Sequence, residues 1–98
     1  MNILLVCSAG MSTSLLVNKM SDAARARGLD ARIWAVADAK AAEEVKQADV
    51  MLLGPQVRFL ADKMRAVAGD VPVDVIDMVT YGTMDGEKAL DQALALVG

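Results

Sequence analysis

The chain alternates short apolar runs with segments that have the spacing of amphipathic helices, and this alternation restricts the fold more than any other feature of the sequence. The apolar runs cover residues 3–7, 29–36, 50–53 and 71–76. Apolar and polar residues alternate over 29–36, as in an edge strand with one covered face, whereas 50–53 is continuously apolar, as in a central parallel strand. Strands that alternate with helices predict an α/β domain with a parallel sheet and right-handed crossovers.

The segments between the runs carry signals for helix starts and ends. Gly28 and Gly69 are expected to end the first and third helices, because glycine readily adopts the left-handed conformation found there. Pro55 is favoured at the first position of a helix and Asp85 as an N-cap, so we expect these residues to open the third and fourth helices. The helical pattern covers 12–27 and 39–48 in the first two helices, and the expected inward residues are Phe59, Leu60, Met64 and Val67 in the third and Leu90, Leu94 and Val97 in the fourth.

Composition limits both the size of the fold and the chemistry available to it. A chain of 98 residues has interior for one core, so residues 1–98 are expected to form a single domain. The net charge of -3 disfavours nucleic acid as a partner, since such binders need a basic face. With one cysteine and no histidine, the chain has no internal disulfide, no Ser-His-Asp or Cys-His catalysis and no histidine metal ligand. We therefore predict neither a metal nor a cofactor.

The apolar run at the N-terminus does not indicate a targeting segment. It spans only residues 3–7, and Ser8, Gly10 and Ser12 then interrupt it. A signal peptide needs a basic region and an apolar stretch of about 7–15 residues, and a membrane span needs about 20. The sequence predicts a reduced cytoplasmic protein that does not insert into the membrane.

The segment after the first strand contains the clearest candidate site. Parallel sheets place ligand sites outside the carboxyl ends of their strands, where this chain has its sole cysteine, Cys7. Small and hydroxyl residues before a helix allow backbone N–H groups to converge on an anion, and a helix N-terminus also favours a thiolate. We therefore expect an exposed, reactive thiol in a phosphate-binding loop made of Ser8, Ala9, Gly10, Met11, Ser12, Thr13 and Ser14.

The spacing within this loop separates it from related phosphate loops. Low-molecular-weight tyrosine phosphatases have a Cys-x5-Arg loop after the first strand of a parallel sheet, but the arginine position here holds Thr13. Without the guanidinium that clamps the phosphoryl group, the loop is suited to hold phosphate on sulfur and poorly suited to hydrolyse it. A Walker A loop is excluded, because no second glycine is followed by Lys and Ser or Thr.

Residues 7–17 closely resemble the phosphocysteine loop of IIB components of the bacterial sugar phosphotransferase system, lactose/cellobiose/chitobiose family. The resemblance continues through residues 52–57, 75–77 and 81–86, and so covers nearly the whole chain. It implies a four-stranded parallel sheet in the order 2-1-3-4, flanked by helices on both faces. It also implies that Cys7 takes a phosphoryl group from phosphohistidine on a IIA partner. The cysteine then passes it to a sugar, the 6-hydroxyl of a β-linked disaccharide, held by the membrane IIC component.

The implied strand order gives roles to two further segments. The first and third strands become neighbours, so Gly54, Pro55 and Gln56 border the cysteine loop. Tyr81 and Gly82, in the loop after the fourth strand, stand beside them. We expect these residues to shape the rim on which IIA and IIC dock. The chain is then a protein-phosphocysteine–sugar phosphotransferase that is recruited to the membrane through IIC.

Other interpretations of the same residues remain open. A phosphatase or arsenate-reductase-like thiol enzyme shares the scaffold, and a non-catalytic module would bind an anion with Cys7 unmodified. A lone cysteine at a strand end is often part of the core, and the loop hydroxyls also serve as helix caps. Asp74 and Asp77 could suggest a receiver-like phosphoacceptor, but that fold needs an aspartate at the end of its third strand, where this chain has Gly54.

Overall fold

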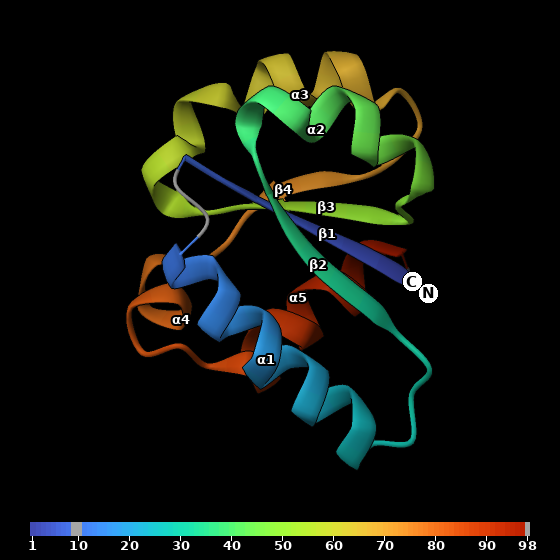
Figure 1. Cartoon of the computed structure of the whole chain (residues 1–98), viewed down its shortest axis with the longest axis vertical. Helices are drawn as coiled ribbons and strands as arrows, with labels where there is room; N and C mark the ends of the chain where they lie inside the picture. The colour runs from blue at the N-terminus through green and yellow to red at the C-terminus, as the bar shows by residue number, and fades with distance from the viewer. Residues whose placement is uncertain (9–10, 98) are drawn as a thin grey trace.

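The computed structural model describes residues 1–8 and 14–97 in full and residues 11–13 as backbone (Figure 1). Strands and helices alternate along the chain as the apolar pattern predicts. The elements are β1 Asn2–Cys7, α1 Met11–Ala26, β2 Arg32–Ala37, α2 Asp38–Glu44, the 3₁₀ helix η1 Val45–Gln47, β3 Val50–Leu53, the 3₁₀ helix η2 Pro55–Leu60, α3 Ala61–Ala68, β4 Val73–Val75, α4 Met78–Gly82 and α5 Gly86–Val97.

The four strands form one parallel sheet in the order β2-β1-β3-β4, which confirms the predicted order. β2 and β4 are the edges, and β1 and β3 are central and almost wholly buried. Pro72 immediately precedes the edge strand β4, which is a position where a sheet tolerates proline. Its carbonyl oxygen accepts a hydrogen bond from the N–H of Met51 at 2.9 Å, so the proline extends the pairing without needing an N–H of its own.

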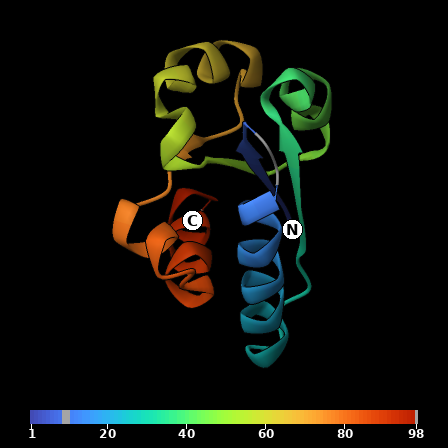
Figure 2. The same cartoon turned by 60° about the vertical axis from the view of Figure 1, so that its left-hand side comes forward.

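Helices cover both faces of the sheet, again as predicted. α1 and α5 lie on one face and α2 and α3 on the other (Figures 1 and 2). Side chains of β1 alternate between the two layers, because successive residues of a strand point to opposite faces. Ile3 and Leu5 pack in the core beneath α1 and α5, whereas Leu4 and Val6 pack in the core beneath α2 and α3.

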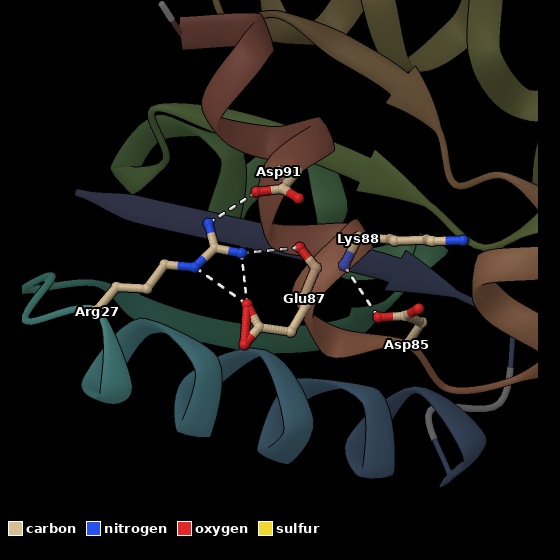
Figure 3. Close-up of polar contacts among 5 residues, drawn as sticks. All are labelled: Arg27, Asp85, Glu87, Lys88 and Asp91. Carbon is tan, nitrogen blue, oxygen red and sulfur yellow. Dashed lines mark hydrogen bonds and ion pairs between the residues drawn. The ribbon is translucent and has the colours of Figure 1, made fainter.

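α1 and α5 approach each other closely and are joined at the surface by ion pairs. A Cβ atom at Gly86 would overlap the backbone of Lys19, so only glycine allows this approach. Arg27 donates from Nη1 to Asp91 Oδ1 at 2.7 Å and from Nε to Glu87 Oε1 at 3.1 Å (Figure 3). These hydrogen bonds, to Asp91 first and Glu87 second, raise the pKa of Arg27. The guanidinium is therefore charged at neutral pH.

The predicted helix ends agree with the structure at three positions. Gly28 has φ +69° and follows α1, where its N–H donates to Arg25 O at 3.1 Å and the next N–H donates to Ala24 O at 2.9 Å. This is the Schellman pattern of a helix that ends at glycine. Gly69 likewise has φ +62° after α3. Asp85 caps α5, since its Oδ1 accepts from the N–H of Lys88 at 3.1 Å.

The predicted inner face of the third helix is wrong at two residues. Phe59 is 77% exposed and Val67 is 41% exposed, while Val57 and Met64 are buried. The prediction assumed a regular α-helix from Pro55, but the chain first winds as the 3₁₀ helix η2 and has non-helical angles at Val57. A 3₁₀ helix has 3.0 residues per turn where an α-helix has 3.6, so the inward positions shift.

Two smaller expectations near the C-terminus also fail. Val97 is 40% exposed, and the buried face of α5 consists of Ala89, Leu90 and Ala93. The segment containing Tyr81 and Gly82 is the short helix α4, not a loop. Asp77 starts α4, because its carboxylate accepts from the N–H groups of the second and third residues that follow it, at 3.1 and 3.2 Å.

Candidate functional site

The carboxyl ends of the strands meet at one edge of the sheet, and Cys7 lies at the centre of that edge. It is the last residue of β1, where it pairs with Ala37 of β2. On the other side, Gly54 follows β3 and donates its N–H to the carbonyl oxygen of Val6 at 2.9 Å. α1 begins at Met11, so a helix N-terminus follows the cysteine after a short connection. This is the strand, loop and helix order that the sequence predicts.

The expectation of an exposed thiol is wrong, because Cys7 is only 1% exposed. Strands lie on both sides of β1, and strand alternation places Cys7 on the same face as Ile3 and Leu5, which α1 and α5 cover. Ser8, the next residue, is exposed. The chain therefore passes from buried at Cys7 to exposed at Ser8, where it leaves the sheet.

Part of the predicted phosphate loop lies outside the described residues. These are Ala9, Gly10 and the side chains of Met11, Ser12 and Thr13. Ser14 is exposed in the first turn of α1. The first N–H groups of any α-helix have no partner within the helix, so the start of α1 supplies donors at this edge.

The structure brings together the two segments that were expected to form the rim. Gln56 Nε2 donates to the hydroxyl oxygen of Tyr81 at 2.9 Å, which joins η2 to α4. Gly54 and Pro55 are buried at the start of η2, and Gly82 is exposed at the end of α4. The connection from β4 into α4 is also held at this edge, where the N–H of Ile76 donates to Leu53 O at 2.8 Å.

Three large apolar side chains project from the same two elements, and the sequence analysis did not identify them. Phe59 is 77% exposed on η2, and Met78 and Val79 are each 66% exposed on α4. They are the most exposed large apolar side chains of the described part of the chain. The sequence does contain a signal for the start of α4, because Asp77 before Met78 and Val79 is a helix N-cap pattern.

Among the residues that the structure describes, no group of three or more histidine, cysteine, aspartate or glutamate side chains could hold a metal ion. Carboxylates do occur at this edge, at Asp38 after β2 and at Asp77 after β4, but they do not form such a group. Within the same described ranges, none of the helices is both long and apolar enough to cross a bilayer.

Comparison with known protein families gives a match over almost the whole chain. The family model described as PTS system, Lactose/Cellobiose specific IIB subunit, matches residues 2–92. The chain is 50% identical over 97 residues to the PTS system oligo-beta-mannoside-specific EIIB component of Bacillus subtilis (strain 168), covering 97% of this chain and 94% of the relative. It is 46% identical over 98 residues to the PTS system galactose-specific EIIB component of Lactococcus lactis subsp. cremoris (strain MG1363), covering 93% of this chain and 91% of the relative.

Solved structures show the same fold. The lactose-specific IIB component domain from Streptococcus pneumoniae superimposes with a TM-score of 0.90 at 19% identity, covering 100% of this chain and 98% of the other. The cellobiose-specific phosphotransferase IIB component from Borrelia burgdorferi gives a TM-score of 0.82 at 41% identity, covering 99% of this chain and 91% of the other.

Proposed function

The chain belongs to the lactose/cellobiose-specific IIB subunits of the sugar phosphotransferase system, and we propose that it is a phosphocysteine carrier with Cys7 as the phosphoryl acceptor. IIB components act as phosphotransferases and work with IIA and IIC partners. One observation carries the proposal. The sole cysteine ends the central strand β1, just before the N-terminus of α1, where the unpaired N–H groups of a helix start can hold the oxygens of a phosphoryl group.

The proposed reaction has two phosphoryl transfers at one sulfur. The Cys7 thiolate attacks the phosphorus of phosphohistidine on IIA, so that an S–P bond forms, the N–P bond breaks and the imidazole leaves with the electron pair. The 6-hydroxyl oxygen of the sugar then attacks the same phosphorus, the S–P bond breaks, and the hydroxyl proton is released. Backbone N–H groups of residues 8–14 hold the phosphoryl oxygens throughout. Catalysis is then positioning and preorganised electrostatics, without a metal or cofactor.

The burial of Cys7 adds a condition to this mechanism. A sulfur that is 1% exposed becomes reachable only when a partner docks at the carboxyl edge of the sheet. The rim of Gly54, Pro55, Gln56, Tyr81 and Gly82 surrounds that approach. Phe59 on η2 and Met78 and Val79 on α4 are exposed apolar side chains on the elements that follow β3 and β4, and in this proposal a docking partner covers them. Docking on IIC also recruits the chain to the membrane.

The sugar is proposed only as a class. The relatives at 46–50% identity are named for oligo-β-mannosides, galactose and cellobiose, so identity does not select among them. A β-linked disaccharide held by IIC fits the family as a whole. In this proposal IIC selects the sugar, because Cys7 makes contact with only the transferred group.

The decisive experiment is phosphoryl uptake from a phosphorylated IIA protein of this family. Intact-mass and peptide mapping should show one phosphoryl adduct on Cys7 of the wild-type chain. Cys7→Ser should retain the fold by circular dichroism and take up no phosphoryl group, because a serine hydroxyl is a far weaker nucleophile than a thiolate. A stable adduct on the Cys7→Ser variant would refute the assignment.

A second experiment separates the carrier from a hydrolytic thiol enzyme. Restoring the phosphatase arginine with Thr13→Arg should shorten the lifetime of the phosphocysteine, because a guanidinium stabilises the transferring phosphoryl group. Loss of adduct over time is followed by intact mass, with Thr13→Lys as a charge-matched control that lacks bidentate geometry. Turnover of an aryl phosphate or arsenate by the wild-type chain alone would instead favour the thiol-enzyme alternative.

A further inference from the structure

A side-chain hydrogen bond crosses the rim beside Cys7. Gln56 Nε2 in η2 donates to the hydroxyl oxygen of Tyr81 in α4 at 2.9 Å, across 25 residues of sequence. Gln56 is exposed, whereas Tyr81 is partly buried and packs against the core beneath α1 and α5. The exposed Gln56 side chain is therefore held by an aromatic residue that packs against the core.

The side-chain amide of Gln56 also lies close to Gly54. A Cβ atom added to Gly54 would come within 2.6 Å of Gln56 Oε1 and 3.2 Å of its Cδ. Gly54 is in turn joined to β1, because its N–H donates to the carbonyl oxygen of Val6, the residue before Cys7, at 2.9 Å. A continuous chain of contacts thus runs from Tyr81 through Gln56 and Gly54 to the end of β1.

This chain of contacts matters because the site lacks a charged clamp of its own. The position that holds arginine in the phosphatase loop is Thr13. Transfer at Cys7 then depends on how accurately uncharged groups are placed, and a displacement of about 1 Å can reduce a rate by about 100-fold.

We propose that Gln56 and Tyr81 are a positioning pair, which holds the segments after β3 and β4 against the end of β1 and so sets the rate of phosphoryl transfer at Cys7. The inference rests on the proposed function. It concerns the rate of transfer once the donor has docked, which kcat measures separately from KM.

Three substitutions break the pair by different routes. Tyr81→Phe removes the acceptor oxygen and keeps the ring, and Gln56→Met removes the donor at similar length. Gly54→Ala adds a Cβ that pushes the carboxamide away. Its backbone angles, φ -61° and ψ 148°, suit alanine, and the displaced atoms are the end of a flexible side chain, so the fold is retained.

The experiment measures transfer from phosphorylated IIA to the full chain, with kcat and KM for the donor determined separately. Each variant should lower kcat about 5- to 20-fold with KM unchanged. The double variant Gln56→Met with Tyr81→Phe should be no slower than Tyr81→Phe alone, because Gln56 then has no bond to the Tyr81 hydroxyl left to lose. The ³¹P resonance of the phosphocysteine should shift in all three single variants.

The matched control is Gln47→Met, which removes a similar bond elsewhere. Gln47 is also exposed, and its Oε1 accepts from Arg32 Nη1 at 3.2 Å across η1 and β2. It should leave kcat and the ³¹P resonance unchanged. Unchanged kcat in the three rim variants, or a rise in KM alone, would overturn the positioning role while Cys7 phosphorylation stood. Absence of any adduct on the wild-type chain would instead overturn both proposals.

Discussion

The two ends of the parallel strands differ in the side chains that surround them. The amino edge is the end at which the strands start, and the carboxyl edge is the end at which they finish. At the amino edge, backbone and side-chain groups at the starts of the strands form hydrogen bonds with one another. Asp49 Oδ2 accepts from the N–H of Asn2 at 2.7 Å, and Asn2 Nδ2 donates to Gln47 O at 2.7 Å. The N–H of Arg32 donates to Met1 O at 2.8 Å. These bonds join the starts of β1, β2 and β3 within the chain.

The carboxyl edge presents apolar side chains to solvent. Phe59, Met78 and Val79 are 66–77% exposed there, and Cys7 lies buried behind the same edge. Exposed apolar groups of this size add nothing to the stability of the isolated chain and favour association. The comparison shows that polar contacts within the chain join the strand starts at the amino edge, whereas the carboxyl edge leaves large apolar side chains exposed, as the proposed docking requires.

The largest expected effect is at the two ends of β1. Cys7→Ala at the carboxyl end should abolish phosphoryl uptake, since no other thiol is present, and should lower the free energy of unfolding by only about 1 kcal/mol for the small cavity. Asn2→Ala at the amino end should leave uptake intact. Intact mass after incubation with phosphorylated IIA and urea unfolding measure the two quantities. Uptake by Cys7→Ala would show that phosphorylation does not depend on this edge.

Removal of the exposed aromatic should weaken docking without harming the fold. Phe59→Ser should reduce kcat/KM with phosphorylated IIA about 10-fold, because aromatic side chains often dominate binding energy at interfaces. The free energy of unfolding should change by no more than about 0.5 kcal/mol, since Phe59 is 77% exposed. Val67→Ser, at an apolar residue 41% exposed on α3, is the control. Equal loss of kcat/KM in both variants would count against a specific docking role for η2.

At the amino edge, a substitution should lower stability and leave phosphoryl transfer unchanged. Asp49→Ala removes the acceptor for the N–H of Asn2 and should lower the free energy of unfolding by about 1 kcal/mol. Transfer from phosphorylated IIA should be unchanged at a temperature well below unfolding. Asp70→Ala changes an exposed aspartate before β4 and controls for the loss of charge. A transfer defect in Asp49→Ala would break the division between the edges.

The smallest effect is expected for the surface ion pairs between α1 and α5. Because the pKa of Arg27 is raised above an already high value, its charge does not change near neutral pH, and its contribution to stability does not vary there. Salt should screen it, since the Debye length falls to about 3 Å at 1 M. Arg27→Met should therefore slightly lower the midpoint of thermal unfolding at low salt and not at high salt. An equal loss at both salt concentrations would assign it to packing of the side-chain stem.

Much of the architecture was predictable because it depends on local pattern. β3 occurs at the predicted residues 50–53, and Gly28 and Asp85 end and begin helices as expected, since periodicity and capping act over a few residues. Phe59 was not predictable in the same way. Its orientation depends on the 3₁₀ winding of η2, which no single residue of the segment specifies.

The candidate site also has one feature that was predictable from the sequence and one that was not. The position of Cys7 between an apolar strand and a helix start follows from the order of residues alone. Its burial does not, because 1% exposure results from β2, β3 and the covering helix layer, which are distant in sequence.

The sequence by itself determined the alternation of strands and helices, the residues that cap them and the single thiol that the chain contains. Only the tertiary structure decided that this thiol is buried, that Phe59 faces solvent and that Gln56 meets Tyr81 across 25 residues. The physical reason is the separation along the chain between the residues that interact. Capping and periodicity are interactions between near neighbours in the chain, whereas exposure and cross-strand contacts depend on which distant segments the parallel sheet places side by side.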